Sequence, residues 1–140
     1  MATPNYTSAQ IRSILNGWGH RTKTAADGPN FPISEDNSPL TDALTVEAIK
    51  KFQREYGLKV DGIVGPITKN KAAEVVSGLQ LELNKCVNGA IPDNQPFYGP
   101  VTVAAVKKLE AKLKLAQDGV ASNSLRVKLY DLFKSGACPL

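Results

Sequence analysis

The chain contains an internal repeat, and this feature limits the folds it can adopt more than any other. Residues 44–63 (LTVEAIKKFQREYGLKVDGI) align without a gap with residues 101–120 (VTVAAVKKLEAKLKLAQDGV), at a constant offset of 57 residues. Such a match predicts two copies of one structural unit. Eight of the twenty aligned positions are identical, namely Thr45/Thr102, Val46/Val103, Ala48/Ala105, Lys50/Lys107, Lys51/Lys108, Leu58/Leu115, Asp61/Asp118 and Gly62/Gly119.

The repeat sets the expected domain organisation of the 140 residues. We expect a first unit at residues 1–77 and a second unit at residues 78–140, divided near Val76-Ser77-Gly78. Units of this size are close to the lower limit at which a chain forms a core by itself. We therefore expect the two units to pack together and to share an interface.

Hydrophobic periodicity predicts short amphipathic helices in both units. No segment alternates regularly between apolar and polar residues, so strands are not expected beyond trivial ones. The predicted fold class is all-α, with two tandem three-helix modules packed together. The expected buried stripes of the first two helices in each unit are Ile11, Ile14, Leu15 and Trp18, then Val46, Ile49, Phe52 and Tyr56, then Leu79, Leu83, Cys86 and Val87, and finally Val103, Val106, Leu109 and Leu113.

Capping and turn residues indicate where the helices of the first unit begin. Thr7 with Gln10 has the pattern of a capping box. Thr45 is the expected N-cap of the second helix and Thr68 of the third. Asp61-Gly62 between them is a turn pair, because Asp bonds its downstream backbone and Gly accepts a positive φ.

Charge and hydropathy exclude two classes of partner. The net charge of +4 comes from 17 Lys and Arg against 13 Asp and Glu, scattered without a dense basic run, so a nucleic-acid partner is not expected. No apolar run reaches the length of a membrane span. The first residues lack the pattern of a secretory signal, so the expected location is the cytoplasm unless the chain is exported or released by another route.

The sequence offers no catalytic residue, no metal ligand set and no cofactor motif. His20 is the single histidine, which leaves a zinc hydrolase without ligands, and a cationic role at the end of the first helix is expected for it. Two cysteines 52 residues apart form no metal quartet. Free thiols, with Cys86 in the core, are the favoured interpretation, and a disulfide to Cys138 stays open.

The first unit resembles the peptidoglycan-binding-domain-1-like family, whose signature has the form AhxxFQxxxGLxxDGhhGxxT. The match runs through residues 48–53, Gly57-Leu58 and residues 61–68, and it is strong over residues 44–76. The second unit is a degenerate match, with Leu109-Glu110 in place of the Phe-Gln pair. The resemblance implies three short helices and binding to the bacterial cell wall, usually as a targeting module of a hydrolase or as part of a lysis or wall-modifying protein.

The predicted function is therefore non-catalytic binding of bacterial peptidoglycan, through its glycan or its stem peptide, in a bacterial or phage protein. The alternative is an intracellular adaptor or assembly component that uses the same scaffold to bind a protein partner. Exposed aromatic, amide and cationic groups suit a wall ligand. The candidate ligand-binding residues, expected to border one shallow groove, are Asn30, Phe31, Arg54, Lys59 and Tyr98.

Overall fold

The computed structural model describes residues 3–138, and this part of the chain contains five α-helices, one 3-10 turn and no strand. The predicted all-α class is confirmed. None of the described helices is long and apolar enough to cross a membrane. The elements are α1 (Ser8–Gly17), η1 (Ala25–Asp27), α2 (Ala43–Glu55), α3 (Pro66–Val87), α4 (Pro100–Lys112) and α5 (Asn123–Ser135).

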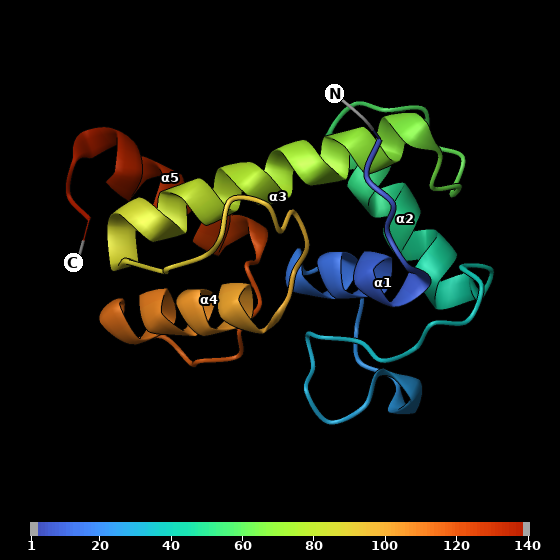
Figure 1. Ribbon diagram of the computed structural model, residues 1–140, viewed down its shortest axis with the longest axis horizontal. Helices are drawn as coiled ribbons and strands as arrows, with labels where there is room; N and C mark the ends of the chain where they lie inside the picture. Colours follow the sequence, from blue (N-terminus) through green and yellow to red (C-terminus); the bar gives the residue numbers. More distant parts are fainter. Residues whose placement is uncertain (1–2, 139–140) are drawn as a thin grey trace.

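The longest element, α3, extends along the whole molecule, with α1 and α2 at one end and α4 and α5 at the other (Figure 1). Its 22 residues pass without interruption through the position near Ser77 at which the sequence divides the two units. The sequence predicted two helices here. Gly78 does not end the helix, because the buried side chains of Val76 and Leu79 continue on either side of it. The organisation into two repeated units remains a prediction.

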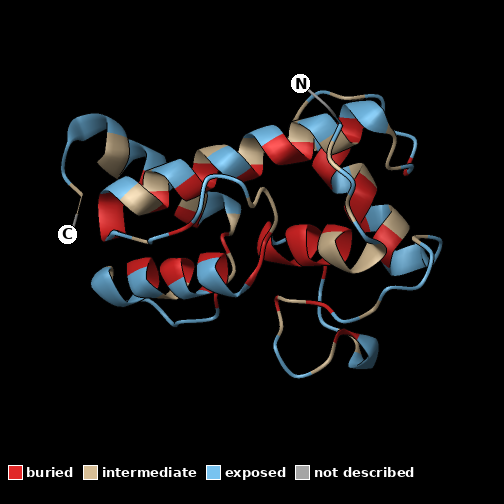
Figure 2. Ribbon diagram, viewed as in Figure 1, coloured by how far each residue is buried: buried red, intermediate tan, exposed pale blue. Residues whose placement is uncertain are grey.

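One continuous hydrophobic core joins all five helices. Figure 2 shows the buried faces of α1, α3 and α4 turned toward one another. Phe52 and Trp18 are both 2% exposed, which confirms their expected core positions. The most deeply buried apolar residues come from every helix: Ile14, Ile49, Phe52, Val76, Leu83, Val87, Val106, Leu109 and Leu129.

The predicted helix starts are correct for α1 and wrong for two others. At α1, Thr7 and Gln10 form the complete capping box. The N-cap of α2 is Asp42 rather than Thr45, whose N–H donates to the Asp42 carboxylate at 3.1 Å. The N-cap of α3 is Gly65 rather than Thr68. There Pro66 occupies the first helical position, where its fixed φ and missing N–H are tolerated.

Cys86 and Cys138 form a disulfide, with Cα atoms 4.6 Å apart, so the favoured interpretation of two free thiols is wrong. Gly136 ends α5 in the left-handed region at φ 73° and turns the chain back toward the end of α3. The partly buried Cys138 therefore reaches the buried Cys86. The bond holds the C-terminal segment against the core.

Candidate binding site

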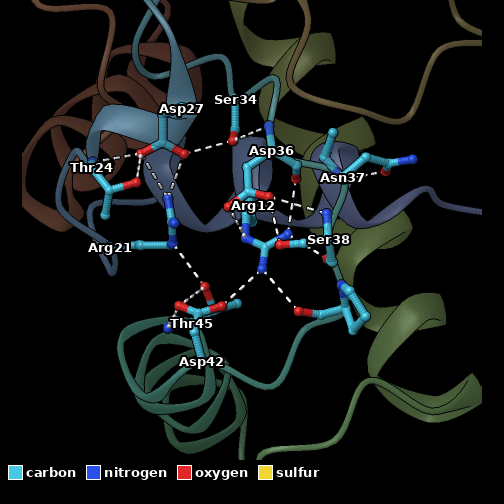
Figure 3. Close-up of polar contacts among 12 residues, drawn as sticks. Arg12, Arg21, Thr24, Asp27, Ser34, Asp36, Asn37, Ser38, Asp42 and Thr45 are labelled. Atoms are coloured by element: carbon cyan, nitrogen blue, oxygen red, sulfur yellow. Dashed lines mark hydrogen bonds and ion pairs between the residues drawn. The ribbon is translucent and has the colours of Figure 1, made fainter.

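Two buried arginines hold the long loop between α1 and α2 in place (Figure 3). The guanidinium of Arg21 donates to both oxygens of Asp27, at 2.8 and 3.0 Å, and its Nε donates to Thr45 Oγ1 at 3.0 Å. Ser34 Oγ donates to Asp27 as well, at 2.6 Å. Both members of the Arg21–Asp27 pair are fully enclosed. The pair links the loop to the start of α2.

The second arginine, Arg12 on α1, binds the end of the same loop. It donates to the backbone oxygens of Asp36, Ser38 and Pro39 at 2.7–3.0 Å, and to the carboxylate of Asp42 at 2.8 Å. Its side chain is completely buried. The loop is therefore fixed along its length by ion pairs and backbone contacts. Neither arginine is part of a recognisable sequence motif: Arg12 lies within α1 among its buried residues, and Arg21 follows the end of that helix by four residues.

The carboxylates of this network are held in their charged form. Burial alone would raise the pKa of Asp27, but hydrogen bonds from Ser34, Thr24 and Arg21 outweigh it and the net pKa is lowered. The same balance lowers the pKa of Asp42 to about 2, where burial is opposed by bonds from Arg12 and Thr45. The network is consequently charged and intact at neutral pH.

Because it is fixed, the loop forms a cavity of about 440 Å³ against α4, which we call the loop pocket. Phe31 supplies a half-buried ring, Asn30 an exposed amide and Lys107 an ammonium group. No hydrogen bond or ion pair joins the side chains of Asn30 or Lys107 to another residue of the described chain. They are available to a ligand. The lining residues are Pro29, Asn30, Phe31, Ile33, Pro100, Val103, Ala104 and Lys107.

The structure does not gather the predicted site residues into one groove. Asn30 and Phe31 line the loop pocket, whereas Lys59 lines a separate cavity of about 180 Å³ beside the Asp61 turn, the turn pocket. Arg54 is exposed on α2, 3.7 Å from the carboxylate of Glu47. A role in ligand binding remains a prediction for each of these residues.

The expected exposure of Tyr98 is wrong, since only 1% of the residue is exposed. Its ring meets Trp18 edge-on at 6.4 Å, and its hydroxyl donates to the backbone oxygen of Gly119 at 2.6 Å. The ring occupies space left by Gly17, where an added Cβ would lie 2.6 Å from three ring atoms. Tyr98 thus fills the centre of the fold, and a ligand at the surface does not reach it.

The signature residues of the first unit build the turn that precedes α3. Gln53 Oε1 accepts from the backbone N–H groups of Asp61 and Gly62 at 3.1 and 3.0 Å and so connects α2 to the turn. Its amide Nε2 donates to the Asp61 carboxylate and to the backbone oxygen of Ile63. Both ends of the Gln53 amide are therefore used for structure.

At the corresponding turn of the second half, Glu110 replaces the glutamine. Its carboxylate accepts from the N–H of Gly119 at 2.9 Å. Burial, together with the neighbouring Asp118 carboxylate, raises the pKa of Glu110 to about 7. Only 4% of Glu110 is exposed, so water does little to stabilise its charged form.

The remaining titratable cluster pairs His20 with Glu55 at 2.7 Å. Burial is the largest cause of a lowered pKa at His20, and the neighbouring Glu55 carboxylate acts against it. A cationic role for His20 at the end of α1 remains a prediction. Within residues 3–138, no group of three His, Cys, Asp or Glu side chains is placed to hold a metal ion.

Comparison with known proteins gives one family match, which lies in the first half of the chain. Residues 9–71 match the family model described as "Putative peptidoglycan binding domain". The match contains α1, the long loop, α2 and the start of α3, and therefore Asn30, Phe31, Arg54 and Lys59. Tyr98 and the α4 wall of the loop pocket lie outside it.

A curated relative gives a second point of comparison. The chain is 26% identical over 129 residues to the N-acetylmuramoyl-L-alanine amidase CwlL of Bacillus licheniformis, an alignment that covers 64% of this chain and 36% of the amidase. The chain therefore aligns with about a third of that enzyme's length. No solved structure matches the chain significantly.

Proposed function

We propose that this protein binds the peptidoglycan of the bacterial cell wall without cleaving it. The observation that carries the proposal is the match of residues 9–71 to a peptidoglycan binding domain. The similarity to an enzyme named as an N-acetylmuramoyl-L-alanine amidase also supports a wall ligand, because amidases of that name act on a component of the wall. The expectation that the wall is not cleaved is supported by the loop network and the Gln53 turn, where the polar side chains are bonded to one another and to backbone atoms.

The loop pocket is the place at which we expect the wall ligand to bind. Its apolar lining and the ring of Phe31 can pack against a ligand's alkyl groups, while the Asn30 amide and the Lys107 ammonium offer hydrogen bonds. Free carboxylates, which stem peptides carry, would pair with Lys107. The net charge of +4 also favours approach to an anionic polymer.

Retention on purified sacculi tests the proposal. The protein and an unrelated basic protein of similar charge are incubated with sacculi at low salt and at about 0.5 M salt, where exposed charges are largely screened. Specific retention should survive the higher salt. Phe31→Ala should reduce it, whereas Lys128→Ala, at an exposed position on α5 that lines none of the cavities described here, should not. Retention no better than that of the basic control would refute the proposal.

Labelled sacculi in the same assay test the absence of cleavage. The expected result is that label stays with the insoluble wall over hours at the protein concentration that saturates binding. Soluble labelled fragments, absent from a control with heat-denatured protein, would show that the chain is an enzyme.

The alternative of a protein partner draws support from exposed apolar side chains at the turn pocket. Ile63 and Ile67 are 66% and 73% exposed and lie beside Lys59 in the same cavity. Apolar groups this exposed often mark contact surfaces. Co-purification of one stable protein partner, lost in Ile67→Lys while retention on sacculi is absent, would favour this alternative over wall binding.

A further inference from the structure

A third cavity lies where the end of α2, the middle of α3 and α5 meet, and we call it the α3 groove. It has a volume of about 250 Å³. Its walls come from both halves of the sequence, and it is separate from the loop pocket. The lining residues are Trp18, Tyr56, Val75, Gly78, Leu79, Glu82, Arg126 and Tyr130.

Gly78 is an unusual residue for the lining of this groove. It lies inside a 22-residue helix, where glycine costs about 1 kcal/mol relative to alanine. No heavy atom lies within 4 Å of the position that a Cβ would take, and its backbone is not in the positive-φ region. Neither packing nor backbone geometry requires glycine here. The missing side chain leaves the groove open.

The positive charge within the groove is already neutralised. Arg126 forms an ion pair with Glu55, and its other nitrogens donate to the backbone oxygens of Ala121 at 2.8 Å and Trp18 at 3.2 Å. Its guanidinium also stacks over the Trp18 ring, 4.9 Å from the centroid. Arg126 is thus a structural cation with no free donor face for a ligand.

The negative charge in the groove has no such partner. The carboxylate of Glu82 is half-buried and makes no hydrogen bond or ion pair with any residue between 3 and 138. Burial raises its pKa, since nothing offsets the loss of water. Every other buried carboxylate of the described chain is hydrogen-bonded. A positively charged ligand in this groove would form an ion pair with Glu82.

The aromatic side chains of the groove attract cations. Lys71 Nζ lies 6.0 Å from the centroid of the Tyr56 ring, and Lys134 Nζ lies 5.9 Å from that of Tyr130. Lys71 is itself paired with Glu74 at 2.7 Å. Tyr130 is 49% exposed, so part of its ring is open to a ligand. Tyrosine rings beside an unpaired carboxylate form an environment that favours an ammonium group.

We propose that the α3 groove binds a primary ammonium group on an aliphatic chain, as carried by the diamino acid of a peptide. The ammonium pairs with Glu82, and the aliphatic chain lies over Gly78 between Val75 and Leu79. The choice of a wall stem peptide as the carrier rests on the proposed function. The ammonium chemistry rests on the groove alone.

Calorimetry with two synthetic peptides tests the inference. The probe is the pentapeptide L-Ala-γ-D-Glu-L-Lys-D-Ala-D-Ala with its N-terminus acetylated. Its partner carries a further acetyl group on the lysine Nε, which removes the single ammonium charge. The full chain should bind the free amine at least tenfold more tightly than the acetylated form. Glu82→Gln should abolish that preference. Glu74→Gln, an exposed carboxylate on the same helix, is the matched control and should retain it.

A variant that fills the groove makes the test independent of charge. Gly78→Leu improves helix propensity and meets no heavy atom at its Cβ, so circular dichroism should show an unchanged or more stable fold while peptide binding is lost. Equal binding of both peptides, or a retained preference in Glu82→Gln, would overturn the inference. Peptide binding without retention on sacculi would refute the proposed function alone. Retention on sacculi without a preference for the free amine would refute this inference alone.

Discussion

The replacement of a turn glutamine by Glu110 makes a specific prediction about stability. Gln53 accepts from the backbone of its turn with one end of its amide and donates to Asp61 with the other. Glu110 reproduces the acceptor but, when ionised, faces Asp118 with a second negative charge. Glu110→Gln should restore the donor and remove the charge without changing the size of the side chain.

The raised pKa of Glu110 sets the size and the direction of the change in stability with pH. Burial raises the pKa of Glu110 to about 7 from an ordinary 4.5, so the folded state prefers the protonated form. The contribution of Glu110 to folding stability is therefore fully present below its unfolded-state pKa. It falls as the pH rises toward 7 and is lost above pH 7. The full difference corresponds to about 3 kcal/mol. Water near the exposed Asp118 screens part of it, so we expect a loss on the order of 2 kcal/mol.

Urea unfolding at pH 5 and at pH 8 measures this loss. The natural chain should lose on the order of 2 kcal/mol between the two pH values through Glu110, and Glu110→Gln should lack that loss and be the more stable protein at pH 8. The difference between the two proteins isolates Glu110, because the other titrations are shared. Gln53→Glu is the matched control and should introduce the same pH dependence in the first half. Parallel pH profiles for the natural chain and Glu110→Gln would refute the reasoning.

Three further predictions concern the core. Arg21→Ala leaves the buried Asp27 carboxylate without its ion pair and should lower the free energy of unfolding, measured in urea, by about 3–5 kcal/mol. Arg54→Ala breaks an exposed pair and should lower it by less than about 1 kcal/mol. Gly17→Ala forces the Tyr98 ring to move and should lower the free energy of unfolding by about 1–3 kcal/mol. Adding Tyr98→Leu to Gly17→Ala should raise the melting temperature again, because the smaller side chain leaves room for the new methyl group. Cys138→Ser opens a loop of 52 residues and should cost about 2–4 kcal/mol, matched by the natural chain under reducing conditions; identical melting with and without reductant would contradict it.

Features specified by neighbouring residues were predictable from the sequence. The capping box of Thr7 and Gln10 depends on three residues of spacing, and the contact of Gln53 with its turn depends on a motif within one short segment. The α2 start shows the limit of this reasoning. Asp42 and Thr45 are both good caps, and in the fold Asp42 caps the helix while the buried Thr45 hydroxyl accepts from Arg21.

Features specified by distant residues were not predictable from local patterns. The disulfide requires the end of α5 to turn back to α3, and the burial of Tyr98 requires the space beside Gly17 on α1. The loop pocket depends on the long loop of the first half reaching α4 in the second, where Pro32 lies near Gly119. Asn30 and Phe31 were identified as candidates by their chemistry, but the α4 residues opposite them, including Lys107, were not.

The unbroken course of α3 affects how tightly a polymeric ligand would be held. A helix of 22 residues is about 33 Å long, and its buried residues anchor it to the helices at both ends. The loop pocket, against α4, and the α3 groove, at the middle of α3, are therefore held at a constant separation instead of moving on a flexible linker. A repetitive polymer that occupies one cavity would present its next repeat to the other at a high effective concentration, and weak individual contacts would then add up to strong avidity.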